Sequence, residues 1–405
     1  MDIYKTYEKR FAFQAAKLHY KVSSKLELIV VIPAYNEISL IKSVESVLAN
    51  LYSKSKYEII VVFNAAENDV EGREVNRFAE QELITFIEQN KLTENVLTLN
   101  ELLPKKHAGV GLARKIGMDE ASARFNSIQN LKGVIVCFDA DSLCQTNYLQ
   151  SIEDFFSQNE KIAAASIHFE HPLSGTEFSE EIYFGILHYE LHLRYYKQGL
   201  AFANLPFAYH SIGSSMAVRA KDYLKQGGMN RRKAGEDFYF LQKFIDIGLL
   251  GEINSITVIP SPRKSDRVPF GTGRAIKEML EEKRKIEYSY AFEVFKTLKN
   301  CFTNVNTWYH KADEIDSKLI EFVGKEEFFR KIEEIKSNAS SQDVFLNRFF
   351  QWFNAFQALK FVHFLRDNYY PNKSLKTEVP KLLNRFEGSD VKTMLLELRR
   401  LDQSS

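Results

Sequence analysis

Lys-Gly-Val-Ile-Val-Cys-Phe-Asp-Ala-Asp, residues 132–141, is the stretch from which the fold of this chain can be predicted. Val134 to Phe138 form an unbroken, β-branched apolar run, typical of a parallel strand covered on both faces. Asp139 and Asp141 follow two residues apart, so in extended backbone both side chains leave one face beyond the strand's carboxyl end. Open α/β sheets bind ligands at that edge. Two close carboxylates favour a bound Mg²⁺ or Mn²⁺, and the alternative is an ordinary turn in which one aspartate caps the next helix.

Composition narrows the class of protein. The 405 residues allow one large domain with an appendage, or two domains. Lys plus Arg number 54 against 53 Asp plus Glu, and this balance gives no reason to expect a nucleic-acid partner. Three irregularly spaced cysteines fit a reducing, cytoplasmic protein, and no segment reaches the roughly 20 apolar residues of a membrane span.

Alternating apolar runs and helical periodicities predict an α/β fold with a mixed, mainly parallel sheet flanked by helices. We expect an N-terminal helical arm over residues 1–25 and a catalytic domain over 26–274. The predicted strands of that domain are 26–32, 57–63, 96–99, 134–138, 162–168 and 253–259. The predicted helices are 40–51, 73–89, 147–157, 179–196 and 235–247, and the segment 105–114 leads into a further helix that continues to about residue 125.

Residues 275–405 lack strong strand patterns and predict a helical C-terminal region. Its aromatic stretch, residues 345–370, is interrupted by Arg348, Lys360 and Arg366, which argues against membrane spanning. We interpret the region as an appendage docked on the catalytic domain. Peripheral contact with the inner face of a membrane is the alternative.

Four landmarks occur in a fixed order: the loop Pro33-Ala-Tyr-Asn-Glu37, the segment 109–117, Asp139-Ala-Asp141 and Gly235-Glu-Asp237. Together they resemble the family 2 glycosyltransferases, whose Rossmann-like fold is called GT-A. The resemblance covers about residues 26–262. It implies a nucleotide-diphospho-sugar donor, UDP- or GDP-linked, and a divalent cation, Mn²⁺ or Mg²⁺.

The resemblance also implies roles for individual positions. The segment containing Ala113, Arg114 and Gly117 matches one in which small residues let a helix approach the nucleotide. The family usually has an Asp after its second strand to read the base, and here Asn64 stands in that place, which leaves the base open. The residues implied in nucleotide and donor binding are Pro33, Ala34, Tyr35, Glu37, Asn64, Asp69, Arg114, Asp139, Gly213, Ser214 and Arg267.

Metal binding and catalysis are assigned on the same basis. Asp139 and Asp141 match the metal-binding pair, and His210 is a further candidate ligand, although a lone histidine beside aromatic residues is usually a packed one. An inverting transferase needs a carboxylate to take the acceptor hydroxyl's proton. Asp237 is our first candidate and Glu236 our second; the alternative is that both merely complement a helix dipole.

The predicted function is non-processive sugar transfer to a hydroxyl-bearing glycan or lipid-linked acceptor, in cell-envelope glycan or glycolipid synthesis. A Gln-x-x-Arg-Trp string, typical of processive synthases, is missing after residue 237. One alternative is a non-catalytic sugar-nucleotide-binding or interaction protein. A sugar nucleotidyltransferase is less favoured, because the loop 33–37 has neither glycine nor a basic residue. The oligomeric state stays open.

Overall fold

The computed structural model describes residues 2–53, 56–267, 271–312, 315–384 and 390–404. Its central feature is an eight-stranded mixed sheet in the order β3-β2-β1-β4-β7-β6-β8-β5. Strands β1 to β4 run parallel, β7 is antiparallel to both neighbours, and β6 is parallel to β8. The strands are β1 (Leu28–Ala34), β2 (Tyr57–Ala66), β3 (Val96–Leu103), β4 (Val134–Cys137), β5 (Leu143–Cys144), β6 (Ala164–Phe169), β7 (Met216–Arg219) and β8 (Leu250–Ile259).

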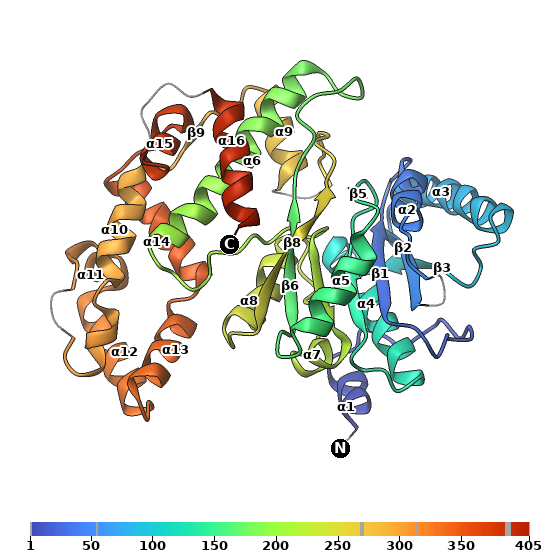
Figure 1. The fold of residues 1–405 in the computed structure, drawn as a ribbon, viewed down its shortest axis with the longest axis horizontal. Helices are drawn as coiled ribbons and strands as arrows, with labels where there is room; N and C mark the ends of the chain where they lie inside the picture. The colour runs from blue at the N-terminus through green and yellow to red at the C-terminus, as the bar shows by residue number, and fades with distance from the viewer. Residues whose placement is uncertain (1, 54–55, 268–270, 313–314, 385–389, 405) are drawn as a thin grey trace.

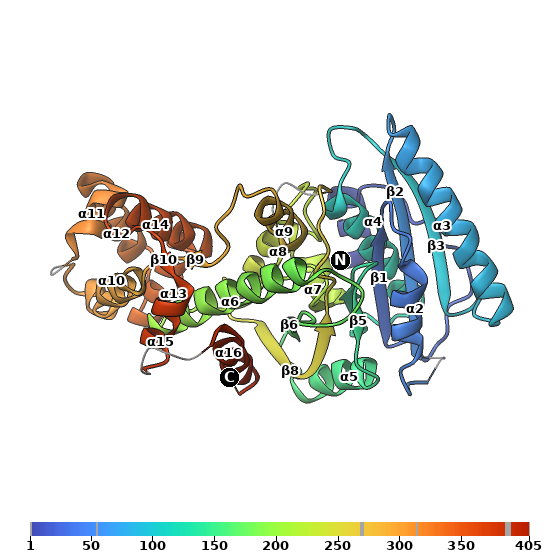
Figure 2. The ribbon, with the colours of Figure 1, turned by 90° about the horizontal axis from the view of Figure 1, so that it is seen from above.

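Helices cover both faces of this sheet (Figures 1 and 2). Strand β1 shows why: Leu28, Val30 and Ile32 join the core beneath one set of helices, and Ile29 and Val31 join the core on the other face. The expected mixed, mainly parallel sheet flanked by helices is therefore confirmed. The helices are α2 (Leu40–Leu48), α3 (Val70–Gln89) and α5 (Tyr148–Gln158) on the first face, and α4 (Val110–Ser127), α7 (Ala220–Lys225) and α8 (Glu236–Ile245) on the second.

The long helix α6 (Glu180–Phe202) joins the sheet to a C-terminal helical lobe, as Figure 2 shows. Leu191, Tyr195 and Leu200 of α6 belong to the lobe's own hydrophobic core. The lobe contains α9 (Thr272–Leu280), α10 (Phe292–Phe302), a 3₁₀ turn (Val305–Tyr309), α11 (Ser317–Val323), α12 (Lys325–Ser337), α13 (Gln342–Trp352), α14 (Ala355–Asn368), α15 (Leu375–Leu382), α16 (Val391–Gln403) and a short ribbon of β9 (Tyr288–Ser289) with β10 (Lys373–Ser374).

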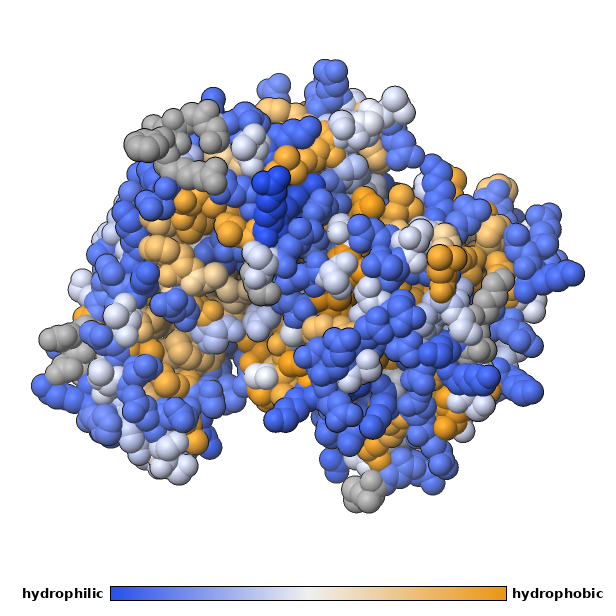
Figure 3. All heavy atoms as spheres, viewed as in Figure 1, coloured by the Kyte–Doolittle hydropathy of each residue, from blue (hydrophilic) through white to orange (hydrophobic). Residues whose placement is uncertain are grey.

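Many aromatic side chains of the stretch 345–370 pack inside this lobe. Phe345, Phe349 and Phe361 are fully buried in its core. On the face seen in Figure 1, hydrophobic residues gather around α10 and α14, and a notch separates the lower end of the lobe from the sheet domain (Figure 3). Within the described residues, no helix is both long and apolar enough to cross a bilayer.

The N-terminal arm differs from its prediction as a helix over residues 1–25. Helix α1 spans only Ile3–Arg10, and the chain from Phe11 to Lys25 is irregular. The reason lies on α4, where the buried Glu120 accepts hydrogen bonds from the backbone N–H groups of Lys17 (2.5 Å) and Leu18 (3.2 Å). These bonds satisfy the backbone without a helical turn.

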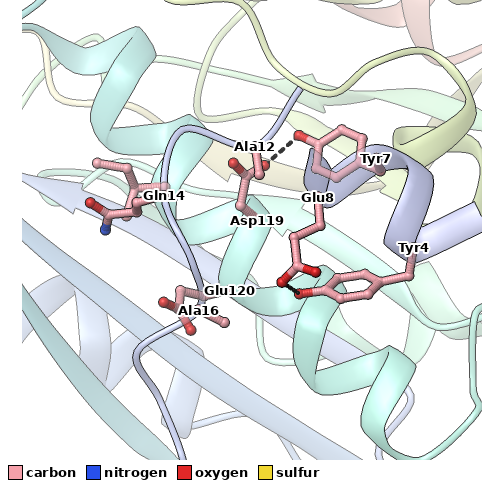
Figure 4. Close-up of a pocket in the computed structure, with 9 residues that line it drawn as sticks. Tyr4, Tyr7, Glu8, Ala12, Gln14, Ala16, Asp119 and Glu120 are labelled. Atoms are coloured by element: carbon pink, nitrogen blue, oxygen red, sulfur yellow. Dashed lines mark hydrogen bonds between the residues drawn. The ribbon is translucent and has the colours of Figure 1, made fainter. Parts of the chain in front are cut away.

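Tyr7 anchors the helical part of the arm. Its hydroxyl donates to Asp119 Oδ1 on α4 (2.5 Å) and accepts from Lys115 Nζ (2.6 Å). Figure 4 shows the hydrogen bond between Tyr7 and Asp119, and both residues line a small cavity. The cavity has a volume of about 10 Å³, roughly the room of one water molecule. The arm is therefore tied to α4 by polar contacts as well as by packing.

Candidate active site

One buried arginine connects the acid after β4 with the acids at the start of α8. Arg114, in the second turn of α4, is 1% exposed. Its Nη2 donates to Asp139 Oδ1 at 2.7 Å, and its Nη1 donates to Glu236. Burial raises the pKa of Asp139, and the Arg114 charge opposes that rise. Two landmarks far apart in sequence thus meet at one guanidinium group.

The start of α8 presents the two predicted catalytic acids differently. Gly235 takes a left-handed backbone (φ 70°) that favours glycine, and the helix begins at Glu236. Glu236 is buried, and Asp237 is only partly so. Burial, followed by the neighbouring Glu236 charge, raises the pKa of Asp237 to about 7, and the charge of Asp139 adds to the rise. Asp237 and Asp139 therefore share one electrostatic environment, in which Asp237 can accept a proton near neutral pH.

The glycine-centred segment before β7 covers the same arginine. A Cβ built on Gly213 would lie 2.8 Å from Nη2 and 3.0 Å from Nη1 of Arg114, so only glycine allows this approach. Ser214 and Ser215 follow, each 1% exposed, with their hydroxyl oxygens 3.5 Å apart. The structure thus brings Gly213 and Ser214 to Arg114, Asp139 and Glu236.

A second cluster of charges surrounds Asp141. Arg263 Nε donates to Asp141 Oδ2 at 2.6 Å, and another nitrogen of Arg263 donates to Glu37. Arg267 Nη1 donates to the carbonyl oxygen of Tyr35 (2.9 Å) and to Glu37 Oε2 (3.2 Å), and Arg267 Nη2 lies 3.5 Å from Asp141 Oδ2. Burial raises the pKa of Glu37, and Arg263 opposes this rise. Both arginines lie in the basic loop 263–274, of which residues 268–270 lie outside the described residues.

The loop after β1 is held by the N-terminus of α3. Tyr35 donates its hydroxyl proton to Asp69 Oδ2 (2.7 Å), and Asp69 caps α3 by accepting from the N–H of Gly72 (3.0 Å). Pro33 and Ala34 form the last residues of β1, paired with Val62 and Phe63 of β2. Tyr35 and Asp69, which the sequence placed in one binding region, are thus in direct contact.

Two asparagines fix the same loop from beneath. The buried Asn64 donates from Nδ2 to the carbonyl oxygen of Ala34 (2.9 Å), so its amide is used to join the ends of β1 and β2. Asn76 on α3 accepts from the N–H of Asn36 (2.9 Å) and donates to the carbonyl oxygen of Asn64 (2.9 Å). Asn36 has a left-handed backbone, φ 50°, which asparagine tolerates.

Asp139 and Asp141, the carboxylates after β4, could provide some of the ligands of a divalent cation. Asp139 Oδ2 and Asp141 Oδ1 have no hydrogen bond to any described residue, and the charge of Asp141 raises the pKa of Asp139. Two free carboxylate oxygens that interact electrostatically with each other are suitable ligands for Mg²⁺ or Mn²⁺. Within the described ranges, no group of three His, Cys, Asp or Glu side chains is placed to hold a metal. The other ligands would have to come from water and a substrate diphosphate.

The structure does not bring His210 to that pair. Its Nε2 donates to Asp402 Oδ2 on α16 (2.9 Å), and its own carbonyl oxygen accepts from Ser166 Oγ (3.0 Å). Burial lowers the pKa of His210 to about 4. His210 therefore belongs to the contact between the sheet and α16, as expected of a packed histidine.

Two residues of the site were underrated from sequence. Of the arginines in the loop 263–274, only Arg267 was assigned to donor binding, although Arg263 makes the closer contact with Asp141. Asn76 was not singled out at all. The available signal was its position on the buried stripe of α3 with Gly72, Ala79, Leu83 and Ile87, where a polar residue needs a partner.

Comparison with known proteins gives a family match. Residues 29–226 match the family model described as Glycosyl transferase family 2. No curated protein sequence matches the chain. Among solved structures, S. aureus TarS 1-349 in complex with UDP-GlcNAc aligns at 12% identity and TM-score 0.42, over 90% of this chain and 94% of that one. The mannosyltransferase PcManGT from Pyrobaculum calidifontis, in complex with GDP-Man and Mn²⁺, aligns at 13% identity and TM-score 0.35, over 98% and 85%.

Proposed function

Since residues 29–226 match the model of glycosyl transferase family 2, we propose that this chain moves one sugar from a nucleotide-diphosphate donor to a hydroxyl acceptor. The observation that carries the proposal is the position of Arg114, which binds Asp139 and Glu236 and leaves Asp237 beside them with a pKa of about 7. A donor-side acid and a proton-accepting acid are thus adjacent. The donor is UDP- or GDP-linked, and the acceptor is a glycan or a lipid-linked molecule of the cell envelope.

In the proposed step, Asp237 takes the proton of the acceptor hydroxyl while that oxygen forms a bond to the anomeric carbon of the sugar. The bond from this carbon to the diphosphate oxygen breaks, and the diphosphate leaves with the bonding electrons. Attack opposite the leaving group inverts the anomeric configuration. Glu236 has a positioning role, because its charge, held by Arg114, raises the proton affinity of Asp237.

The donor end of the site is assigned to the groups around β1 and β4. Asp139 and Asp141 would hold Mn²⁺ or Mg²⁺, and the bound cation would neutralise charge on the diphosphate. Arg267 and Arg263 add positive charge there. Tyr35, Glu37, Asn64 and Asp69 shape the nucleotide side, and Gly213 and Ser214 lie toward the sugar. The protein works in the cytoplasm, with the inner membrane face as the place of a lipid-linked acceptor.

The test is release of free nucleoside diphosphate from a panel of UDP- and GDP-sugars, with and without Mn²⁺. We expect slow donor hydrolysis by the wild-type protein, lost in Asp237→Asn and in Asp141→Asn. Binding of a nucleotide sugar without any turnover would contradict the proposal and favour the non-catalytic alternative. Turnover unaffected by EDTA would remove the divalent cation from the scheme.

A further inference from the structure

A second pocket lies away from the acids of the candidate active site. It has a volume of about 610 Å³ and lies between α6, the segment 283–290 and α14. Its lining includes His192 of α6, Arg284 and Tyr290 of the segment, and His363 and Arg366 of α14. Figure 2 shows α6 extending from beside the sheet into the lobe that carries β9 and α14. The pocket is thus built by the connecting helix α6 and by the lobe.

The charged side chains that line this pocket are all basic. Its lining contains Lys283, Arg284, Lys285 and Arg366, and no Asp or Glu among the described residues. Lys283 pairs with Glu281 (2.7 Å) and Arg366 with Asp367 (2.7 Å). Arg284 and Lys285 form no ion pair with a described residue. A pocket with two uncompensated cations favours an anionic ligand.

The two cations are held in place by aromatic rings. Arg284 lies over the ring of Tyr189, with its Cζ 5.6 Å from the centroid, and Lys285 lies over Tyr288, with its Nζ 6.0 Å from the centroid. Stacking on a ring face leaves the edge of a guanidinium group free to donate hydrogen bonds to phosphate oxygens. A planar, half-buried arginine of this kind is suited to a phosphate group.

The remaining polar groups are neutral. Burial lowers the pKa of His192 to about 4, and its Nδ1 forms a hydrogen bond of 2.6 Å with Ser289 Oγ. Tyr290 and His363 Nε2 are hydrogen-bonded at 2.9 Å. Neutral imidazoles and phenols exchange hydrogen bonds with hydroxyl groups. The pocket therefore combines cations for a phosphate with neutral groups for a polyol or a sugar.

Tyr189 connects this pocket to the proposed base. It lies on α6, one helical turn before His192, and is buried. Burial raises the pKa of its hydroxyl to about 12, the Arg284 charge lowers it, and the Asp237 charge raises it. The Tyr189 hydroxyl is thus within electrostatic reach of both Asp237 and Arg284.

We propose that the pocket lined by Arg284 and Lys285 binds a phosphate group of the acceptor, so that the acceptor is a phosphate-bearing polyol or sugar. The identification of the ligand as the acceptor rests on the proposed glycosyltransferase function. Phosphate binding itself does not depend on turnover, and the two statements can fail separately.

Binding is measured on the full chain without donor, by thermal-shift titration with glycerol 3-phosphate and with glycerol at constant ionic strength. We expect stabilisation by glycerol 3-phosphate only, and an apparent Kd at least tenfold weaker in the double variant Arg284→Gln, Lys285→Gln. Lys360→Gln on α14, which removes a cation stacked on Phe356, is the matched control and should bind as the wild type does. The double variant Arg284→Lys, Lys285→Arg keeps both charges and should keep most of the affinity.

A second arm separates soluble phosphates from lipid headgroups. Full chain is sedimented with phosphatidylcholine vesicles with and without phosphatidylglycerol. Binding that needs phosphatidylglycerol and both cations, without binding of glycerol 3-phosphate, supports the same chemistry with a lipid as its source. If neither probe binds, or if binding is equal in the wild type and the Gln double variant, the inference is overturned even where donor hydrolysis persists. Phosphate binding without any donor turnover would instead overturn the proposed function.

Discussion

Arg114 is the single side chain on which the candidate site depends most. It is the partner of Asp139 and of Glu236, and Gly213 lies against its guanidinium group. The buried guanidinium group of Arg114 would be costly without an acid, and the buried carboxylate of Glu236 would be costly without the arginine. The guanidinium group is therefore held in place by these surroundings, and in turn it fixes the positions of Asp139 and Glu236.

Arg114→Ala is expected to lower the free energy of unfolding by about 3–5 kcal/mol, because it leaves the buried carboxylate of Glu236 unpaired. Urea unfolding at pH 7 measures this difference. Arg77→Ala removes an exposed arginine paired with Glu74 and should leave the unfolding midpoint unchanged. An equal, small effect of both substitutions would mean that Arg114 is not the central partner.

Asp237→Asn is expected to lower kcat/KM by about 10²–10⁴-fold, the usual contribution of a general base. The reaction needs the ionised carboxylate, so activity of the wild type should rise with pH and level off above the pKa of about 7. A pH–rate profile of nucleoside diphosphate release measures both effects.

The control is Asp246→Asn at the other end of α8, where burial also raises the pKa of the aspartate. This variant should have the same rate as the wild type and the same rise of activity with pH. If the rise of activity with pH persists in Asp237→Asn, the titrating group is not Asp237.

Part of the site was predictable at the residue scale and part was not. Asp139, Glu236 and Asp237 come directly after a strand or at a helix start, and the order of the elements brings such positions to one edge of the sheet. The pairing of Arg263 with Asp141 and of His210 with Asp402 depends on the path of loops and of the last helix. Sequence patterns contain no information on those paths.

Helix α4 shows, at the scale of an element, which features could be predicted from the sequence and which could not. Its small residues were interpreted as allowing an approach to a nucleotide. The structure uses Gly117 for packing instead: a Cβ there would lie 2.4 Å from Val31 Cγ1 and 3.0 Å from Val62 Cγ2. Gly117 therefore allows α4 to pack closely on β1 and β2, and the approach of this helix to a nucleotide stays a prediction.

Tyr7→Phe is expected to destabilise the protein by about 1–3 kcal/mol, because Asp119 and Lys115 on α4 each lose a hydrogen-bond partner. Tyr4→Phe is the matched control. The Tyr4 hydroxyl only reaches Glu8 at 3.5 Å, and its loss should change the midpoint of urea unfolding far less. Equal effects would show that the arm is held by ring packing alone.

Elements with strong patterns were predicted closely, and those fixed by tertiary contacts were not. The strand predicted over 57–63 is β2, which runs three residues further to Ala66, and the helix predicted to continue to about residue 125 is α4, which ends at Ser127. The short β5 pairs with β8 over two residues and has no pattern of its own. The N-terminal helix ends at Arg10 because carboxylates of α4 bind the backbone that follows, which no local periodicity reveals.

At the scale of the whole molecule, α16 fastens the helical lobe to the sheet domain through buried charges. Asp402 accepts from Arg194, Gln198 and His210, and Arg399 donates to Glu190. Burial alone would raise the pKa of Asp402, but the hydrogen bond from His210 and the charges of Lys197 and Arg194 hold it well below its ordinary value. The contact between the two parts is therefore sensitive to acid.

Stability is expected to fall as the pH drops from 6.5 to 4. The pKa of His210 is about 4 in the folded chain and 6.5 ordinarily, so the unfolded chain binds more protons throughout that window. The whole loss is at most about 3 kcal/mol, and the depressed pKa of Asp402 adds a further loss below its unfolded pKa near 3.9. Urea unfolding across this pH range measures the slope. His210→Gln should flatten it and His19→Gln, at an exposed position, should not.

The arginine pairs around Asp141 have a consequence for the order in which ligands bind. Without ligands, Arg263 and Arg267 neutralise Asp141 and Glu37. A cation that binds the carboxylates replaces the arginines, and both guanidinium groups are then free to bind a polyphosphate. Conversely, a polyphosphate that binds the guanidinium groups leaves the carboxylates free to bind a cation. Each ligand should therefore tighten the other by the same factor, as thermodynamic reciprocity requires. Each ligand should therefore bind weakly in the absence of the other.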